Sequence, residues 1–105
     1  MTYITVKEMP IDERPRERLA RVGPQALSTA ELLAIILRTG IGGENVLAMA
    51  SRILSTFDGL GGLALGDFVQ LAAERGLGPA KTAQILAALE LGRRRDLGDV
   101  IRRVG

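Results

Sequence analysis

One short segment of the chain, RGLGPAKTAQI at residues 75–85, combines residue types that suit an anion site. Its two glycines lie two residues apart and lack Cβ atoms, so the backbone can turn tightly and another backbone can approach it. A helix that starts after this turn would present unpaired N–H groups at the positive end of its dipole, with a lysine one turn further on. The spacing predicts a phosphate site formed by Arg75, Gly76, Gly78, Ala80 and Lys81.

The same glycines also have a simpler explanation. Antiparallel helices often need glycines only to reverse the chain, and Pro79 removes one N–H donor from the predicted site. The segment resembles the helix-hairpin-helix motif of proteins that hold the DNA backbone without reading its sequence. Such hairpins also serve as structural or protein-contact elements. Phosphate contact and a purely structural turn therefore both remain open.

A related segment lies 36 residues earlier in the chain. RTGIGGENVLAMASRIL from Arg38 and ERGLGPAKTAQILAALE from Glu74 share a glycine-aliphatic-glycine turn followed by an apolar helix. This repetition predicts two helix-hairpin-helix units related by an approximate internal twofold axis. Glu44 stands where the second copy has Ala80, and a carboxylate near a helix amino end would repel a phosphate. We expect the first copy to be structural.

Arginines gather in two further places. The end of the chain, GRRRDLGDVIRRVG, holds five arginines and two aspartates. Arg93 and Arg94 are candidate phosphate contacts there, although the helix dipole alone favours cations at a helix carboxyl end. The arginines at 14, 16, 18 and 21 alternate with acidic residues, which is most simply a solvated face with local ion pairs.

Composition favours a single small all-α domain with a tandem helix-hairpin-helix core. The chain has 105 residues, 47% of them hydrophobic, and its aromatic residues are Tyr3, Phe57 and Phe68. We expect an extended arm at 1–11, a helical domain at 12–95, and a basic linker at 96–105 that leads toward a domain outside the chain.

Capping residues and glycines divide the chain into about five predicted helices. Ser28 and Glu31 form a capping box, because each side chain can satisfy a free backbone N–H of the other residue. Gly40 can end the helix that follows in the left-handed conformation. The helices are expected between Asp12 and Gly23, from Ser28 to Gly40, from Asn45 to Phe57, from an Asp67 cap to Gly76, and from Ala80 to about Arg95, with one turn of helix in the glycine-rich connection between the third and fourth.

Several classes of function are disfavoured. The chain has no cysteine and no histidine, so disulfides, thiolate metal sites and the most common general base are absent. We expect no catalytic residues, no metal, no cofactor and no enzymatic activity. No apolar run reaches about 20 residues and the start, MTYITVKEMP, lacks the order of a signal peptide, so we expect a cytoplasmic protein without membrane contact. The oligomeric state stays open.

Two longer segments carry a family resemblance. DERPRERLARVGPQALSTAELLAIILRTG at 12–40 and GLGPAKTAQILAALELGRR at 76–94 resemble the amino-terminal region of the RadC family, which is named for DNA repair. The resemblance implies a partner domain of the JAB/MPN metalloprotease-like fold, with metal ligands in a His-x-His…Asp pattern. No such segment occurs in this chain, so none of those ligands is expected here.

Two functions follow as expectations. The favoured one is sequence-independent binding of DNA phosphates at the hairpin from Gly76 to Lys81, helped by Arg75 and by the arginines from Arg93 onward. The competing one is a protein-interaction or regulatory module that docks onto the JAB/MPN domain or onto another protein. Salt-sensitive DNA binding would favour the first. A contiguous exposed apolar patch would favour the second.

Overall fold

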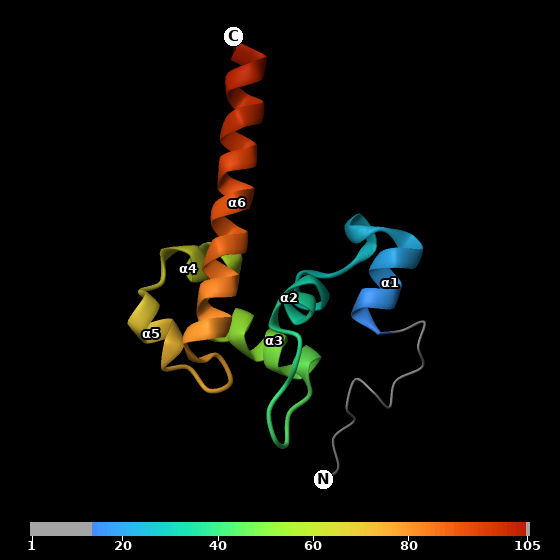
Figure 1. Cartoon of the computed structure of the whole chain (residues 1–105), viewed down its shortest axis with the longest axis vertical. Coiled ribbons are helices and arrows are strands. Elements are labelled where there is room, and N and C mark those ends of the chain that lie inside the picture. Colours follow the sequence, from blue (N-terminus) through green and yellow to red (C-terminus); the bar gives the residue numbers. More distant parts are fainter. Residues whose placement is uncertain (1–13, 105) are drawn as a thin grey trace.

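A computed structural model describes residues 14–104, which form six α-helices and one short 3-10 helix (Figure 1). The all-α prediction is confirmed: between residues 14 and 104 the β pairing is limited to an isolated bridge between Ile41 and Glu44. The expected arm at 1–11 and Asp12 lie outside the described residues. The elements are α1 (Pro15–Val22), η3 (Pro24–Ala26), α2 (Thr29–Leu37), α3 (Val46–Thr56), α4 (Gly59–Leu65), α5 (Phe68–Ala72) and α6 (Gly78–Val104).

The capping residues start the helices where the sequence predicts. Ser28 Oγ accepts a hydrogen bond from the Glu31 N–H at 3.1 Å, and a Glu31 carboxylate oxygen accepts one from the Ser28 N–H at 3.0 Å. Asn45 Oδ1 accepts a hydrogen bond from the Ala48 N–H at 2.9 Å at the start of α3. Asp67 precedes α5 as expected, but its side chain makes no capping hydrogen bond.

The end of α2 differs from the prediction. Arg38, not Gly40, has the positive φ, at 72°, and the Thr39 N–H donates to the Leu37 carbonyl at 2.9 Å, which makes a tight γ-turn. Gly40 is needed for a different reason, since a Cβ there would lie 2.8 Å from the backbone nitrogen of Val46. The glycine permits close approach of two backbone segments where the sequence suggested only a left-handed cap.

The middle of the chain is more helical than expected, and its last predicted helix before the hairpin is shorter. The glycine-rich connection contains α4, a full seven-residue helix, because Leu63 within it is completely buried in the core. Helix α5 ends at Ala72 and not near Gly76, which leaves residues 73–77 as the loop into α6.

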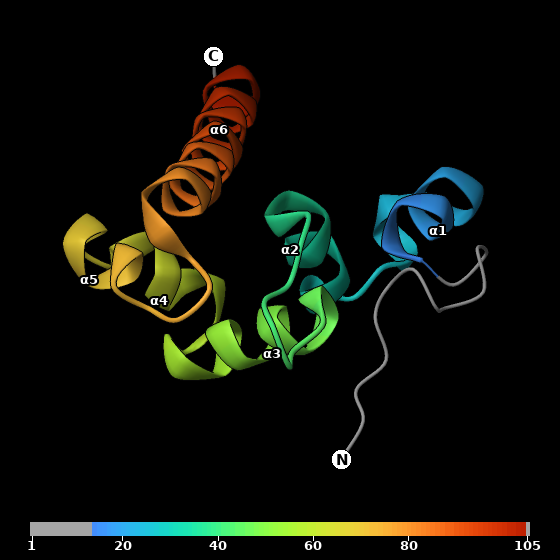
Figure 2. The same ribbon diagram turned by 60° about the horizontal axis from the view of Figure 1, so that its bottom comes forward.

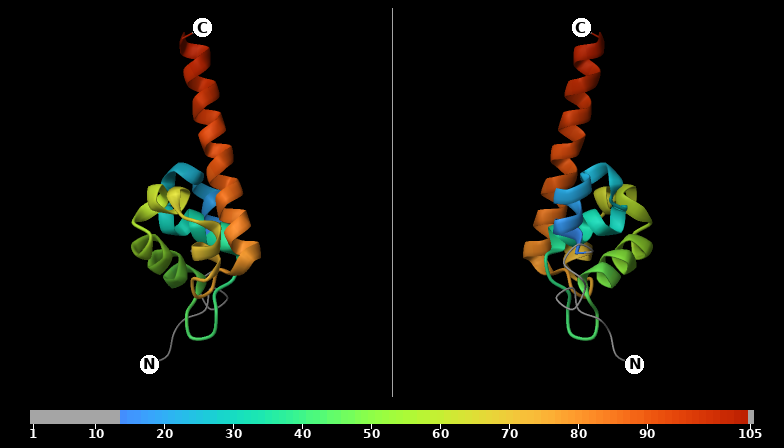
Figure 3. Two further views of the ribbon diagram at one scale, coloured as in Figure 1. Left: turned by 90° about the vertical axis from the view of Figure 1, so that its left-hand side faces the viewer. Right: turned by 90° about the vertical axis from the view of Figure 1, so that its right-hand side faces the viewer.

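Helix α6 is the longest element and exceeds its predicted bounds at both ends. It begins at Gly78 and not at Ala80, and it continues to Val104 where an end near Arg95 was expected. The segment at 96–104, expected as a linker, is therefore helical. Its carboxyl-terminal half extends beyond the other helices in both side views (Figure 3).

The core lies where α2, α3, α4 and α6 meet. Helix α2 packs against α3 and α6, while α4 and α5 pack against α6 from another side (Figure 2). Leu77, between the two glycines of the hairpin, is buried in this core. Other core side chains that are almost completely inaccessible are Leu37, Met49, Ile53, Leu63 and Leu71.

Helix α1 lies at the edge, against α2 (Figure 1). Arg18 Nε donates to a Glu31 carboxylate oxygen at 2.8 Å, so the glutamate of the capping box also joins the two helices. Arg18 therefore belongs to an interhelical ion pair, where the sequence suggested a solvated face. Between residues 14 and 104 no helix has both the length and the apolar character needed to cross a membrane.

Candidate functional site

The loop before α6 has the tight geometry that its glycines predict. Gly76 and Gly78 have φ angles of +89° and +66°, in the left-handed region that favours glycine. A Cβ on Gly76 would also meet the sulfur of Met49 in the core. Gly78 has no heavy atom near its missing Cβ, so only its backbone conformation requires glycine. The pair reverses the chain and directly starts α6.

Lys81 reaches across from α6 to the loop that joins α2 and α3. Its Nζ donates to the Thr39 carbonyl at 2.6 Å and to Thr39 Oγ1 at 3.1 Å. Burial lowers the pKa of Lys81, because partial removal from water disfavours its charged form. Within the described part of the chain no carboxylate pairs with it. Lys81 is thus a half-buried cation bonded to uncharged oxygens.

Arg75 and Ala80, which are also predicted at this hairpin, are exposed. Arg75 donates through Nη2 to the Gly42 carbonyl at 3.4 Å, a long contact that again joins the two interhelical loops. Ala80 lies exposed in the first turn of α6. The structure therefore brings Arg75, Gly76, Gly78, Ala80 and Lys81 together beside the α2–α3 loop.

Arg52 is an organising residue that the sequence reasoning missed. Its guanidinium donates to both carboxylate oxygens of Glu44 at 2.9 and 3.0 Å, to Glu74 at 2.7 Å and to the Arg75 carbonyl at 2.8 Å. The hydrogen bonds between Arg52 and Glu44 lower the pKa of Glu44 and raise that of Arg52. The available signal was that Arg52 is the single charged residue in VLAMASRILST, an otherwise uncharged helix.

The α2–α3 loop does not copy the backbone of the second hairpin. Neither Gly40 nor Gly42 has a positive φ, whereas Gly43 has one of 84°. The chain turns through paired hydrogen bonds between Ile41 and Glu44, at 3.0 and 2.9 Å. The predicted repeat is therefore present in the order helix, loop, helix, but not in the conformation of its glycines.

Arg93 and Arg94 do not join the hairpin. Both pair with Glu90 one turn earlier on α6, at 2.8 and 2.9 Å, and these hydrogen bonds lower the pKa of Glu90 to about 2. Lys81 lies 12 residues before Arg93, which is about 18 Å along the helix axis. The two arginines thus belong to a separate exposed face of α6.

Over residues 14–104, no group of three or more histidine, cysteine, aspartate or glutamate side chains is placed to hold a metal ion. Comparison with known proteins gives one family: the UPF0758 N-terminal domain matches residues 6–83. The chain belongs to the UPF0758 family. This membership supports the resemblance noted in the sequence at the level of the family.

Curated UPF0758 proteins resemble the chain along most of its length. The relative from Chloroflexus aggregans is 50% identical over 90% of this chain and 41% of its own length. The relative from Bacillus licheniformis is 55% identical over 85% of this chain and 40% of its own. The UPF0758 chain thus spans about two fifths of the length of these relatives. No solved structure matches it significantly.

Proposed function

We propose that this UPF0758 chain is a binding module that holds DNA through backbone phosphates, without reading sequence, at the loop before α6. The observation that carries the proposal is the environment of Lys81. Its ammonium group has three N–H donors and donates hydrogen bonds to two uncharged oxygens of Thr39. A phosphate oxygen would supply the counter-charge that this half-buried cation lacks.

The amino end of α6 supports the same ligand. The helix has 27 residues, and its first N–H groups have no partner inside the helix. Such an end carries a partial positive charge and binds phosphate readily, although Pro79 contributes no N–H. Arg75, exposed beside it, adds a second cation. Contacts of this kind position a duplex but carry no sequence information.

The charge balance around the loops also supports phosphate binding. Glu44 lies in the α2–α3 loop and Glu74 in the loop before α6, and Arg52 binds both of them. One arginine offsets one of these two negative charges, and Arg75 and Lys81 add two positive charges. These five groups together therefore carry a net charge of +1, which favours an approaching phosphate.

The test is a fluorescence anisotropy titration of a labelled blunt duplex at two salt concentrations. If three or four phosphates are contacted, log affinity should fall with log salt with a slope of about −3, and a Kd on the order of 10⁻⁵ M is expected. Lys81→Glu should weaken binding at least tenfold. Arg102→Glu makes the same change of charge at the far end of α6 and should leave the affinity nearly unchanged. Salt-independent binding, or equal losses in both variants, would overturn the proposal.

A second candidate function is docking onto another protein domain. On the extended half of α6, Leu91, Leu97 and Ile101 are 68%, 47% and 69% exposed. Most of the length of each UPF0758 relative lies beyond the matched region. That length leaves room for a partner domain, and the RadC resemblance implies one of the JAB/MPN fold. DNA binding that does not depend on Lys81 would favour this candidate.

A further inference from the structure

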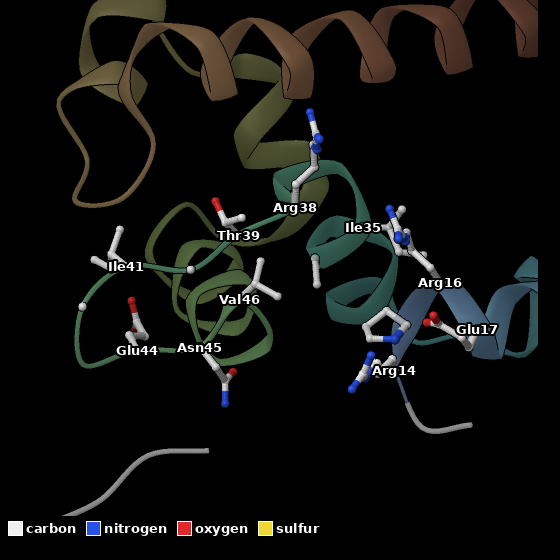
Figure 4. Close-up of a pocket in the computed structure, with 14 residues that line it drawn as sticks. Arg14, Arg16, Glu17, Ile35, Arg38, Thr39, Ile41, Glu44, Asn45 and Val46 are labelled. Atoms are coloured by element: carbon white, nitrogen blue, oxygen red, sulfur yellow. The ribbon is translucent and has the colours of Figure 1, made fainter. Parts of the chain in front are cut away.

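A pocket of about 710 Å³ lies between α1 and the α2–α3 loop (Figure 4). Its size falls within the roughly 300–1,000 Å³ typical of sites for small organic ligands and exceeds what one phosphate group needs. Apolar side chains and cations share the lining. The apolar residues include Pro15, Ile35 and Val46, and the cations among the described lining residues are Arg14, Arg16 and Arg38.

Two of these cations are available to a ligand. The side chains of Arg16 and Arg38 are exposed and make no hydrogen bond or ion pair with any residue from 14 to 104. Among residues 14–104, Glu17 and Glu44 are the carboxylates that line the pocket, and Glu44 is already bound by Arg52. The described lining thus holds three arginines and two glutamates, an excess of positive charge.

Arg38 is held in a backbone conformation that costs free energy. Its φ of 72° and ψ of −50° belong to the γ-turn that ends α2, a strained geometry for a residue with a Cβ. Glycine would adopt it without that strain, yet the chain places a guanidinium there. Strained residues of this kind cluster at ligand sites.

The pocket adjoins the proposed phosphate site. Thr39 lines the pocket, and both of its oxygens also accept hydrogen bonds from Lys81. In Figure 4 Thr39 and Arg38 follow each other along the loop, with Arg14 and Arg16 on the α1 side. The two sites therefore meet at Thr39, and we expect a strand whose phosphate contacts Lys81 to reach the pocket with an adjacent nucleotide.

We propose that this pocket receives one unpaired nucleotide of a DNA strand. Its phosphate binds the guanidinium groups of Arg16 and Arg38, and its base and sugar lie against the apolar wall, where an arginine plane can also stack on the base. The phosphates of an intact duplex lie on a convex surface and cannot enter a recess, whereas an unpaired nucleotide can. The inference rests on the proposed function, because the hairpin holds the rest of the strand.

The test compares a labelled blunt duplex with the same duplex carrying a three-nucleotide overhang, in the anisotropy assay at low salt. The wild-type chain should bind the overhang about tenfold more tightly. Arg38→Gly should reduce this preference below about threefold and leave blunt binding nearly unchanged. Because glycine relieves the strain, this variant should unfold at a higher urea concentration, which excludes misfolding as the cause. Glu17→Gln should increase the preference, and Arg102→Ala, a charge-matched control for the loss of Arg38, should not change it.

The outcomes separate the two proposals. Equal binding of blunt and overhang DNA, with both sensitive to Lys81→Glu, would overturn the pocket inference and leave the proposed function standing. An affinity for the blunt duplex that is unchanged in Lys81→Glu would overturn the proposed function. A free deoxynucleoside monophosphate, added as a competitor at millimolar concentration, identifies the source of the ligand. If it removes the overhang preference, the pocket also accepts free nucleotides. If it does not, the pocket requires a nucleotide within a strand. Either result supports the site when Arg38→Gly removes the preference.

Discussion

Arg52 is the residue on which the arrangement of both interhelical loops depends. Its side chain is 28% exposed and contacts Glu44 in one loop and Glu74 beside the other. Arg52→Ala would leave both carboxylates and the Arg75 carbonyl without this donor. We expect a loss of about 2 kcal/mol in the free energy of unfolding, between the values for exposed and for buried ion pairs. Urea denaturation measures it.

The matched control keeps the charge and changes the shape. Arg52→Lys retains one cation but cannot bind both oxygens of Glu44 in a fork while also reaching Glu74, so an intermediate loss is expected. The alanine variant should also weaken DNA binding, because the freed carboxylates would repel phosphate. A loss below about 0.5 kcal/mol for alanine, the size of an ordinary surface contact, would show that the loops are held by something else.

At the scale of elements, α6 combines an amino-terminal half that packs against the core with a carboxyl-terminal half, from about residue 91 onward, that projects beyond the other helices (Figure 3) and is called its extended half here. Ile85 is buried in the core, whereas Leu91 and Leu97 are exposed. Gly92 and Gly98 lie in the extended half, and a Cβ on either would meet no heavy atom within 4 Å. Gly92→Ala and Gly98→Ala should each stabilise this half of the helix by about 0.5–1 kcal/mol. Amide hydrogen exchange measures this stabilisation, and exchange across residues 90–102 should be slower in both variants.

Gly62→Ala is the matched control within another helix. A Cβ at this position in α4 would collide with the Phe57 carbonyl oxygen, so the same substitution should destabilise the protein, by about 1–3 kcal/mol. Unchanged exchange in the two α6 variants would contradict the expected stabilisation of this part of the helix.

The sequence predicted those elements whose signals are local. Ser28 and Glu31 are three residues apart, and Asn45 bonds to a residue three positions later, so the starts of α2 and α3 could be read directly. The end of α6 could not. Its arginines suggested a terminus near Arg95, but Glu90 and Asp99 pair with arginines one turn away, and the segment contains no proline to stop the helix.

The candidate site was only partly predictable for a related reason. The glycines and Lys81 were recognisable because a hairpin fixes their roles within six residues. Arg52 needs Glu74, 22 positions away, and Lys81 needs Thr39, 42 positions away. Nothing in the local pattern specifies such partners, because they depend on how the helices pack. The pocket between α1 and the α2–α3 loop has the same origin.

For the whole molecule, the dependence of stability on pH should be simple. The chain has no histidine, so no side chain with an ordinary pKa titrates between pH 6 and 8. Glu31 and Glu44 each have a pKa below the ordinary value of 4.5. The pKa of Glu31 is lowered chiefly by its hydrogen bond from the Ser28 N–H, and that of Glu44 chiefly by its hydrogen bonds from Arg52. The folded state therefore binds fewer protons than the unfolded state below that pH, and the stabilisation is lost as pH falls toward the folded pKa values.

We accordingly expect urea midpoints that are constant from pH 8 to 6 and that decrease below about pH 4.5. Glu31→Gln should lower the midpoint at neutral pH and flatten part of the acid dependence, because its carboxylate no longer titrates. A midpoint that stays constant down to pH 3 would contradict the assignment of these two carboxylates.

The length of α6 also sets a direction in space. From Lys81 to Ile101 the helix rises about 30 Å, and each residue turns it by about 100°. A body that grips the far end is consequently fixed in azimuth as well as in distance relative to the hairpins. One residue inserted near Arg95 would move that body by about 1.5 Å but swing it more than a quarter of a circle. A change in the length of the helix therefore alters the orientation of an attached body much more than its distance from the hairpins.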